Sequence, residues 1–194
     1  QFAVANGKKE HALLLDCNTL NYEHIPFELD DYSLLILNSK KPRSLIKSAY
    51  NERKASCDEA LRLLQQHAPI QTLAEARMEH LLLLKDEELI KRARHVIAEQ
   101  LRVNLSKKML ENGDLFTFGK LMNASHASLK DDFEVSGFEL DTLAETAQEL
   151  PGCLGARMTG AGFGGCAIAI VKKESIPAFS EVVATSYTKA TGMN

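Results

Sequence analysis

Residues 157–166 of the chain read RMTGAGFGGC and hold four glycines within six positions. Gly160, Gly162 and Gly165 match the G-x-G-x-x-G pattern of dinucleotide-binding proteins, and an extended apolar stretch precedes them as that motif requires. In a dinucleotide site, however, a helix follows the third glycine, whereas residues 166–171 here read CAIAIV, which is typical of a strand. The stretch therefore predicts a β-hairpin with a glycine-rich turn.

So many glycines in one turn need a physical reason, because glycine loses more conformational freedom on folding than any other residue. One interpretation is a tight turn whose backbone requires positive φ angles. The other is that the missing side chains let the backbone approach a bound phosphate or sugar. The glycines of such a site would be Gly160, Gly162, Gly164 and Gly165.

The rest of the chain shows extended regions at both ends of a helical one. Strands are expected at residues 11–17, 21–27, 31–38, 154–159 and 166–171, and helices at 49–67, 87–111, 115–125, 138–150 and about 177–190. Asp86 is placed to cap the start of the second helix, and Gly113 marks its end. These elements predict an α+β domain in which helices pack over an antiparallel sheet.

The composition excludes several classes of partner. The formal net charge is -3 and no Lys/Arg cluster is long enough to form a nucleic-acid-binding surface, so we expect no nucleic-acid partner. No apolar stretch approaches the roughly 20 residues that span a bilayer, and the first ten residues do not resemble a signal peptide. We therefore expect no membrane partner and a cytoplasmic location. The cysteines show no metal-binding spacing and are expected to be buried, reduced thiols: Cys17, Cys57, Cys153 and Cys166.

Residues 157–166 resemble the third signature motif of the GHMP kinases, in the form found in the galactokinase branch of that family. Other segments resemble the same branch in the same order, namely 1–2, 7–9, 11–17, 38–39, 49–53, 92–95, 125–129, 133–136 and 139–141. The resemblance implies that residues 1–194 form a GHMP kinase C-terminal region with a ferredoxin-like antiparallel sheet and packed helices. The implied activity is transfer of the γ-phosphoryl group of ATP to the anomeric hydroxyl of galactose.

The resemblance also implies that important parts of the enzyme lie outside the chain. The family's catalytic aspartate immediately precedes the glutamine that Gln1 matches, so no catalytic residue is expected within these residues. ATP and Mg²⁺ are expected to bind mainly to an N-terminal half. The family also continues into a last strand after the final helix. An uncovered sheet edge would follow, and with it self-association.

Within the chain, the resemblance assigns Tyr50 to the galactose site. A phenol suits this task because its ring packs on a sugar while its hydroxyl makes one directed hydrogen bond. Taken alone, a tyrosine at a helix start is a packing residue, and Arg53 one turn later is a solvated or ion-paired side chain. The basic cluster of Lys40, Lys41 and Arg43 is interpreted as a solvated loop, with help to a phosphate as the alternative.

The remaining polar candidates favour structural roles. His95 and His126 lie among apolar neighbours in expected helices, without a second ligand at a suitable spacing, so we expect hydrogen-bonded packing residues and not metal ligands. Asp131 and Asp132 are adjacent and point in different directions, which marks a loop after a helix.

Two other functions stay open from the sequence. A galactokinase-like protein without catalysis can act as a ligand-sensing regulator and keep most of these segments. A GHMP kinase that acts on a different small alcohol is the second alternative, against which the segments at residues 49–53 and 125–129 argue.

Overall fold

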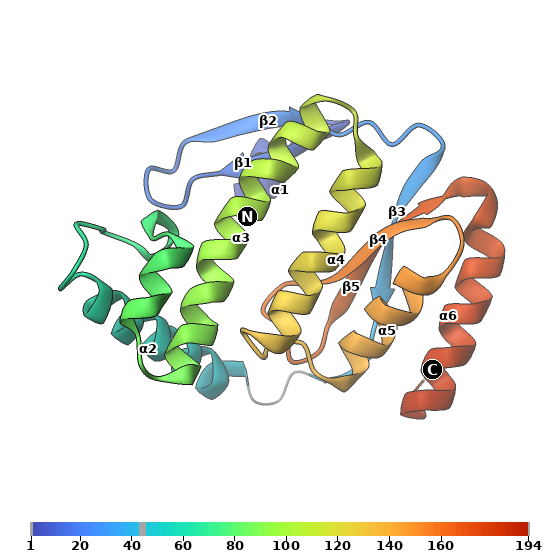
Figure 1. The fold of residues 1–194 in the computed structure, drawn as a ribbon. Helices are drawn as coiled ribbons and strands as arrows, with labels where there is room; N and C mark the ends of the chain where they lie inside the picture. The colour runs from blue at the N-terminus through green and yellow to red at the C-terminus, as the bar shows by residue number, and fades with distance from the viewer. Residues whose placement is uncertain (1, 43–45, 194) are drawn as a thin grey trace.

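The computed structural model describes residues 2–42 and 46–193, so the expectations for Gln1 and Arg43 lie outside the described residues (Figure 1). The helices and strands, in chain order, are α1 (Phe2–Asn6), β1 (His11–Leu15), β2 (Tyr22–Pro26), β3 (Tyr32–Asn38), α2 (Ile46–Leu64), α3 (Glu87–Glu111), α4 (Leu115–Asp131), α5 (Phe138–Glu149), β4 (Cys153–Thr159), β5 (Cys166–Lys172) and α6 (Ile176–Thr191). Short 3₁₀ helices occur at Leu73–Glu75, Met78–Leu83 and Lys173–Ser175. The expected α+β class is confirmed.

The strands form two antiparallel sheets. In the larger sheet the order is β3-β5-β4, and Cys166 in β5 lies opposite both Asn38 of β3 and Thr159 of β4. The end of β3 therefore reaches the glycine-rich turn. The expectation of a single sheet is wrong, because β1 and β2 pair only with each other and form a separate two-stranded sheet. They lie over α3 and α4 instead, where the Phe27 ring packs edge-on against Phe118.

Helices cover one face of the three-stranded sheet, where α5 and α6 bury an apolar core that includes Leu143 and Phe179. α4 lies along the outer edge of β4, where Asn123 and His126 accept the N–H groups of Ala156 and Met158. The two elements touch at two glycines. A Cβ atom on Gly119 would lie 2.2 Å from the Leu154 carbonyl oxygen, and one on Gly155 would lie 2.1 Å from the Gly119 oxygen. Glycine at both positions therefore lets the two backbones touch. Alongside α4 lies α3, and α2 packs on α3.

The ends of α2 and α3 test the expected helix limits. Asp86 caps α3 as expected, because its carboxylate accepts the Leu89 N–H at 3.1 Å. For α2, the expected end at His67 is wrong, and the helix ends at Leu64. The His67 N–H bonds to the carbonyl three residues back, which tightens the chain out of the α-helix before Pro69.

α4 runs six residues further than its expected end at Ser125. Polar residues suggested the end of a helix, but Ser125 and Ser128 are buried. Their hydroxyls bond to side chains of α3, those of Glu99 and His95. The helix continues because a neighbouring helix satisfies these polar groups.

The cysteine expectation needs a correction. All four thiols are free, but Cys17 is exposed and the other three are only half-buried. Cys17 lies in the turn between β1 and β2, where the Asp16 carboxylate accepts the Asn18 N–H and reverses the chain. Burial raises the pKa of the Cys153 thiol to about 11. Among the described residues, no helix has the length and apolar character needed to cross a bilayer.

Candidate functional site

The turn between β4 and β5 has an unusual backbone. The φ angles of Gly160, Gly162, Gly164 and Gly165 are 80°, 85°, 125° and 90°, and that of Phe163 is 56°. Only glycine adopts this region without strain. The hairpin predicted in place of a dinucleotide motif is confirmed, and its conformation accounts for all four glycines.

At two of these glycines, another segment of the backbone occupies the space that a side chain would need. A Cβ atom on Gly162 would lie 2.0 Å from the Val135 carbonyl oxygen, which accepts the Phe163 N–H at 2.8 Å. A Cβ atom on Gly164 would lie 3.0 Å from the Lys41 carbonyl oxygen. At these two positions the missing side chains therefore make room for the protein's own backbone. Approach of a ligand to the turn stays a prediction.

Val135 belongs to the α4–α5 loop, residues 132–137, which arginines hold from outside. Arg53 Nε donates to the Phe133 carbonyl at 2.6 Å, and Arg92 Nη1 donates to the Asp132 carbonyl at 2.6 Å. Glu134 has a φ of 56°, and its carboxylate accepts from Arg92 Nη2 at 2.8 Å. The hydrogen bond from Arg92 lowers the pKa of Glu134. The loop is therefore fixed by charge-assisted bonds to its backbone.

Tyr50 lies in the second turn of α2 and is 58% exposed, so it is not a core residue. Arg53 follows three residues later, on the same side of the helix. Its side chain is only 15% exposed and its Nη2 lies 3.7 Å from the Glu134 carboxylate, so of the two expected roles, solvated or ion-paired, the ion pair is the one present. The structure thus connects the tyrosine's helix to the α4–α5 loop.

The basic cluster and the aspartate pair have separate roles. Lys40 is exposed, as a solvated loop requires. Lys41 instead pairs with the Glu139 carboxylate at 2.7 Å, close to the glycine turn. Asp132 follows α4 as expected, but the expectation of a loop is wrong for Asp131, which is the last residue of the helix. The Asp132 carboxylate accepts from Arg94 Nε at 3.0 Å.

Both histidines are confirmed as hydrogen-bonded packing residues. His95 Nδ1 lies 2.9 Å from the Ser128 hydroxyl, and its ring stacks on Phe133 with centroids 4.4 Å apart. Burial lowers the pKa of His95. His126 is buried, and its Nδ1 accepts the Met158 N–H at 3.2 Å. Each histidine therefore braces a segment next to the α4–α5 loop or the hairpin.

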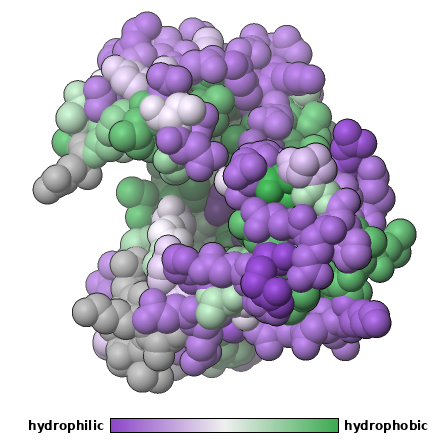
Figure 2. Space-filling model, turned by 90° about the vertical axis from the view of Figure 1, so that its left-hand side faces the viewer, coloured by the Kyte–Doolittle hydropathy of each residue, from purple (hydrophilic) through white to green (hydrophobic). Residues whose placement is uncertain are grey.

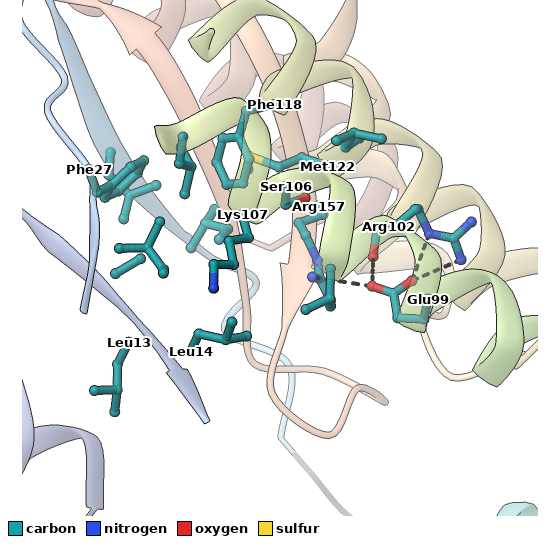
Figure 3. Close-up of a pocket in the computed structure, with 18 residues that line it drawn as sticks. Leu13, Leu14, Phe27, Glu99, Arg102, Ser106, Lys107, Phe118, Met122 and Arg157 are labelled. Carbon is teal, nitrogen blue, oxygen red and sulfur yellow. Dashed lines mark hydrogen bonds and ion pairs between the residues drawn. The ribbon is translucent and has the colours of Figure 1, made fainter. Parts of the chain in front are cut away.

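A separate apolar pocket of about 290 Å³ opens between the β1–β2 sheet, α3, α4 and the larger sheet (Figure 3). Leu13, Leu14, Phe27, Phe118 and Met122 are among its lining residues. A space-filling view shows a hollow in the molecule with apolar surface in its walls (Figure 2). Neither the predicted sugar-contacting tyrosine nor the glycines of the turn line this pocket.

One end of the pocket is charged, which the sequence did not predict. The Glu99 carboxylate accepts from the Ser125 hydroxyl at 2.5 Å and from Arg102 Nε at 2.9 Å, and Arg157 Nη1 lies 3.7 Å away. Burial alone would raise the pKa of Glu99. The Ser125 hydrogen bond and the two guanidinium groups outweigh this effect, so the pKa lies below its ordinary value. Desolvation lowers the pKa of Arg157. The position of Arg157 at the start of the glycine motif was the only signal in the sequence.

Comparison with known proteins identifies relatives for the whole chain. Residues 97–189 match the family model described as GHMP kinases C terminal. A galactokinase of Enterococcus faecalis is 53% identical over 196 aligned residues, which cover 99% of this chain and 51% of the relative. The chain thus spans about half the length of the curated relatives it matches.

Solved structures agree with the sequence matches. The crystal structure of Lactococcus lactis galactokinase complexed with galactose superposes with a TM-score of 0.94 at 52% identity, covering 99% of this chain and 50% of that one. The structure of L. major mevalonate kinase in complex with R-mevalonate gives a TM-score of 0.55 at 20% identity, with 93% and 46% covered. The second similarity concerns the fold alone.

Proposed function

Because the chain belongs to the GHMP kinase family, we propose that it forms the C-terminal half of a galactokinase. Such an enzyme transfers the γ-phosphoryl group of ATP to the anomeric hydroxyl of galactose and releases ADP and galactose 1-phosphate. The observation that carries the proposal is the identity of just over half of all residues with galactokinases along 99% of the chain. The TM-score of 0.94 to a galactokinase complexed with galactose supports it.

In this proposal the chain positions the sugar. Tyr50 contacts galactose through its exposed ring and hydroxyl, and the glycine turn lies at the cleft between the two halves. The anomeric oxygen attacks the γ-phosphorus while the bond to the β,γ-bridging oxygen breaks. The hydroxyl proton passes to the aspartate expected before Gln1. Phosphoryl transfer of this kind depends mainly on positioning and charge stabilisation, which suits a rigid, arginine-braced scaffold.

In this proposal ATP and Mg²⁺ bind mainly to the other half of the enzyme. Within residues 2–42 and 46–193, no group of three or more His, Cys, Asp and Glu side chains is arranged to hold a metal ion. The glycine turn also lacks the helix that would present its N-terminus to a nucleotide phosphate.

The experiment is a hybrid protein that joins the N-terminal half of the Lactococcus lactis galactokinase to this chain. We expect galactose-dependent ADP release within about tenfold of the unmodified Lactococcus enzyme, because the two C-terminal halves share 52% of their residues. The chain by itself is the control and should show no turnover. A folded hybrid without galactose-dependent ADP release would contradict the proposal.

Two further properties belong to this proposal. A cytoplasmic location is supported by the four cysteines, none of which is in a disulfide. Self-association of the isolated chain is supported by β3, whose outer edge has no partner strand among the described residues and whose Ile36 is 71% exposed. Light scattering should show a mass that rises with concentration and falls after Ile36→Lys. A monomer at all concentrations would contradict self-association.

A further inference from the structure

The glycine turn is not held by its own hairpin alone. The Val135 carbonyl of the α4–α5 loop accepts the Phe163 N–H at 2.8 Å, and the same oxygen occupies the space that a Cβ on Gly162 would need. The turn therefore cannot move away from the loop without losing this bond, and it cannot move closer. Its position follows that of residues 133–135.

Arg53 is the connection between that loop and α2. Its Nε donates to the Phe133 carbonyl at 2.6 Å and its Nη2 to the Glu134 carbonyl at 3.3 Å. One side chain thus spans two successive carbonyls, a geometry that the planar guanidinium group provides and a lysine ammonium does not. Glu134, the second of these residues, has a left-handed backbone with a φ of 56°, so the bond also holds a conformation that a free loop would leave.

Tyr50 shares its helix face with Arg53. The tyrosine side chain is mostly exposed, so contacts with neighbouring side chains do not fix its position. Its position depends instead on where the first turns of α2 lie. Arg53 lies one turn further along and joins those turns to the loop. A continuous set of contacts therefore runs from the tyrosine's helix, through the arginine and residues 133–135, to Phe163 in the glycine turn.

We propose that Arg53 is a positioning residue, which sets the distance between Tyr50 and the glycine turn by clamping residues 133–134 of the α4–α5 loop. The inference rests on the proposed function, because it assigns the sugar contact to Tyr50. Arg92 holds the start of the same loop but lies on α3, so it does not connect the loop to the tyrosine's helix.

The first test measures hydrogen exchange of the peptide that contains residues 160–165 in this chain. Arg53→Ala should raise exchange at the Phe163 amide about tenfold or more, because two charge-assisted hydrogen bonds to the loop are lost. Arg53→Lys should give a smaller increase, since one ammonium can satisfy one carbonyl. Arg62→Ala is the matched control, as Arg62 lies on the same helix and pairs with the exposed Glu59. It should leave this exchange unchanged.

The second test uses the same substitutions in the hybrid with the Lactococcus half. Arg53→Ala should raise the KM for galactose about tenfold while the KM for ATP stays constant, and Arg53→Lys should recover part of the loss. A purely structural role would lower the amount of folded enzyme without changing the KM for galactose. If Arg53→Ala does not fold, Arg53→Lys is compared with the unmodified protein in both tests.

The two failures are distinguishable. An unmodified hybrid that folds but does not phosphorylate galactose contradicts the proposed function. Unchanged exchange at residues 160–165 in both Arg53 variants contradicts the link to the turn, whatever the activity of the hybrid. An unchanged KM for galactose in an active Arg53→Ala hybrid contradicts the positioning role.

Discussion

The glycine turn and the apolar pocket both have arginines beside them, but these arginines have different partners. Near the turn, Arg53 and Arg92 donate to backbone carbonyls of the α4–α5 loop, in addition to pairing with the Glu134 carboxylate. At the pocket, Arg102 and Arg157 approach one carboxylate, that of Glu99. The first arrangement fixes where a backbone lies, whereas the second balances charge at the edge of an apolar wall. We therefore expect the turn to tolerate substitution less well than the pocket.

The largest effect should come from the turn. Gly162→Ala places a Cβ 2.0 Å from the Val135 oxygen at a φ of 85°, and we expect a loss of about 3 kcal/mol or more in the free energy of unfolding. Gly113→Ala is the matched control, because Gly113 has a φ of 70° but open space around it, and should cost about 1 kcal/mol. Urea unfolding measures both. Equal losses would show that conformation alone, and not the contact with the loop, requires this glycine.

The pocket should give a smaller loss. Glu99→Leu leaves two arginines without their shared carboxylate and the Ser125 hydroxyl without its acceptor, for an expected cost of about 2 kcal/mol. Glu59→Leu removes an exposed carboxylate that pairs with Arg62 and should cost about 0.5 kcal/mol or less. If Glu99→Leu stabilises the chain in the same urea titration, the charged end is not part of what holds the pocket together.

Tyr50→Phe should act on binding alone. Loss of one hydroxyl hydrogen bond to galactose would raise the KM of the hybrid for galactose about 2- to 12-fold, which corresponds to about 0.5 to 1.5 kcal/mol. The melting temperature should not change, because the side chain is mostly exposed. An unchanged KM for galactose, measured by ADP release, would remove Tyr50 from the site.

The smallest expected effect concerns pH. Burial lowers the pKa of His95 in the folded chain below its ordinary value of 6.5, so the unfolded chain binds a proton that the folded chain resists. Stability should therefore decrease as the pH falls below about 6.5. His95→Gln should show a weaker decrease between pH 7 and pH 5 in urea titrations. The same slope in both proteins would exclude His95 as the cause.

The sequence predicted the hairpin and most of the other elements because their signals are local. Strand–glycine–strand patterning and the Asp86 cap depend on neighbouring residues, and both were right. The predicted end of α4 was wrong because the Ser125 hydroxyl finds its hydrogen-bond acceptor on Glu99, 26 positions away in the sequence. The sheet assignment of β1 and β2 also depends on distant packing partners, which single-chain patterning does not contain.

The same distinction applies to the site. The four glycines of the turn follow from a short motif, whereas Tyr50 was singled out only by the resemblance to a family, and its contact with the sugar stays a prediction. The clamp by Arg53 could not be predicted from the sequence. Its acceptors are backbone carbonyl groups about 80 positions away, and since every residue has a carbonyl group, no residue type marks them. The charged end of the pocket was missed for the same reason, since Arg157 and Glu99 come from distant segments.

The most direct test of the account compares phosphoryl acceptors for the hybrid of this chain with the Lactococcus galactokinase half. Initial rates of ADP release are measured with galactose and with mevalonate at equal concentrations. We predict turnover with galactose and none above the acceptor-free rate with mevalonate, because the chain matches galactokinases at more than half of its residues and mevalonate kinase in fold alone. Turnover with mevalonate, or a folded hybrid that uses neither acceptor, would contradict the assignment of this chain to a galactokinase.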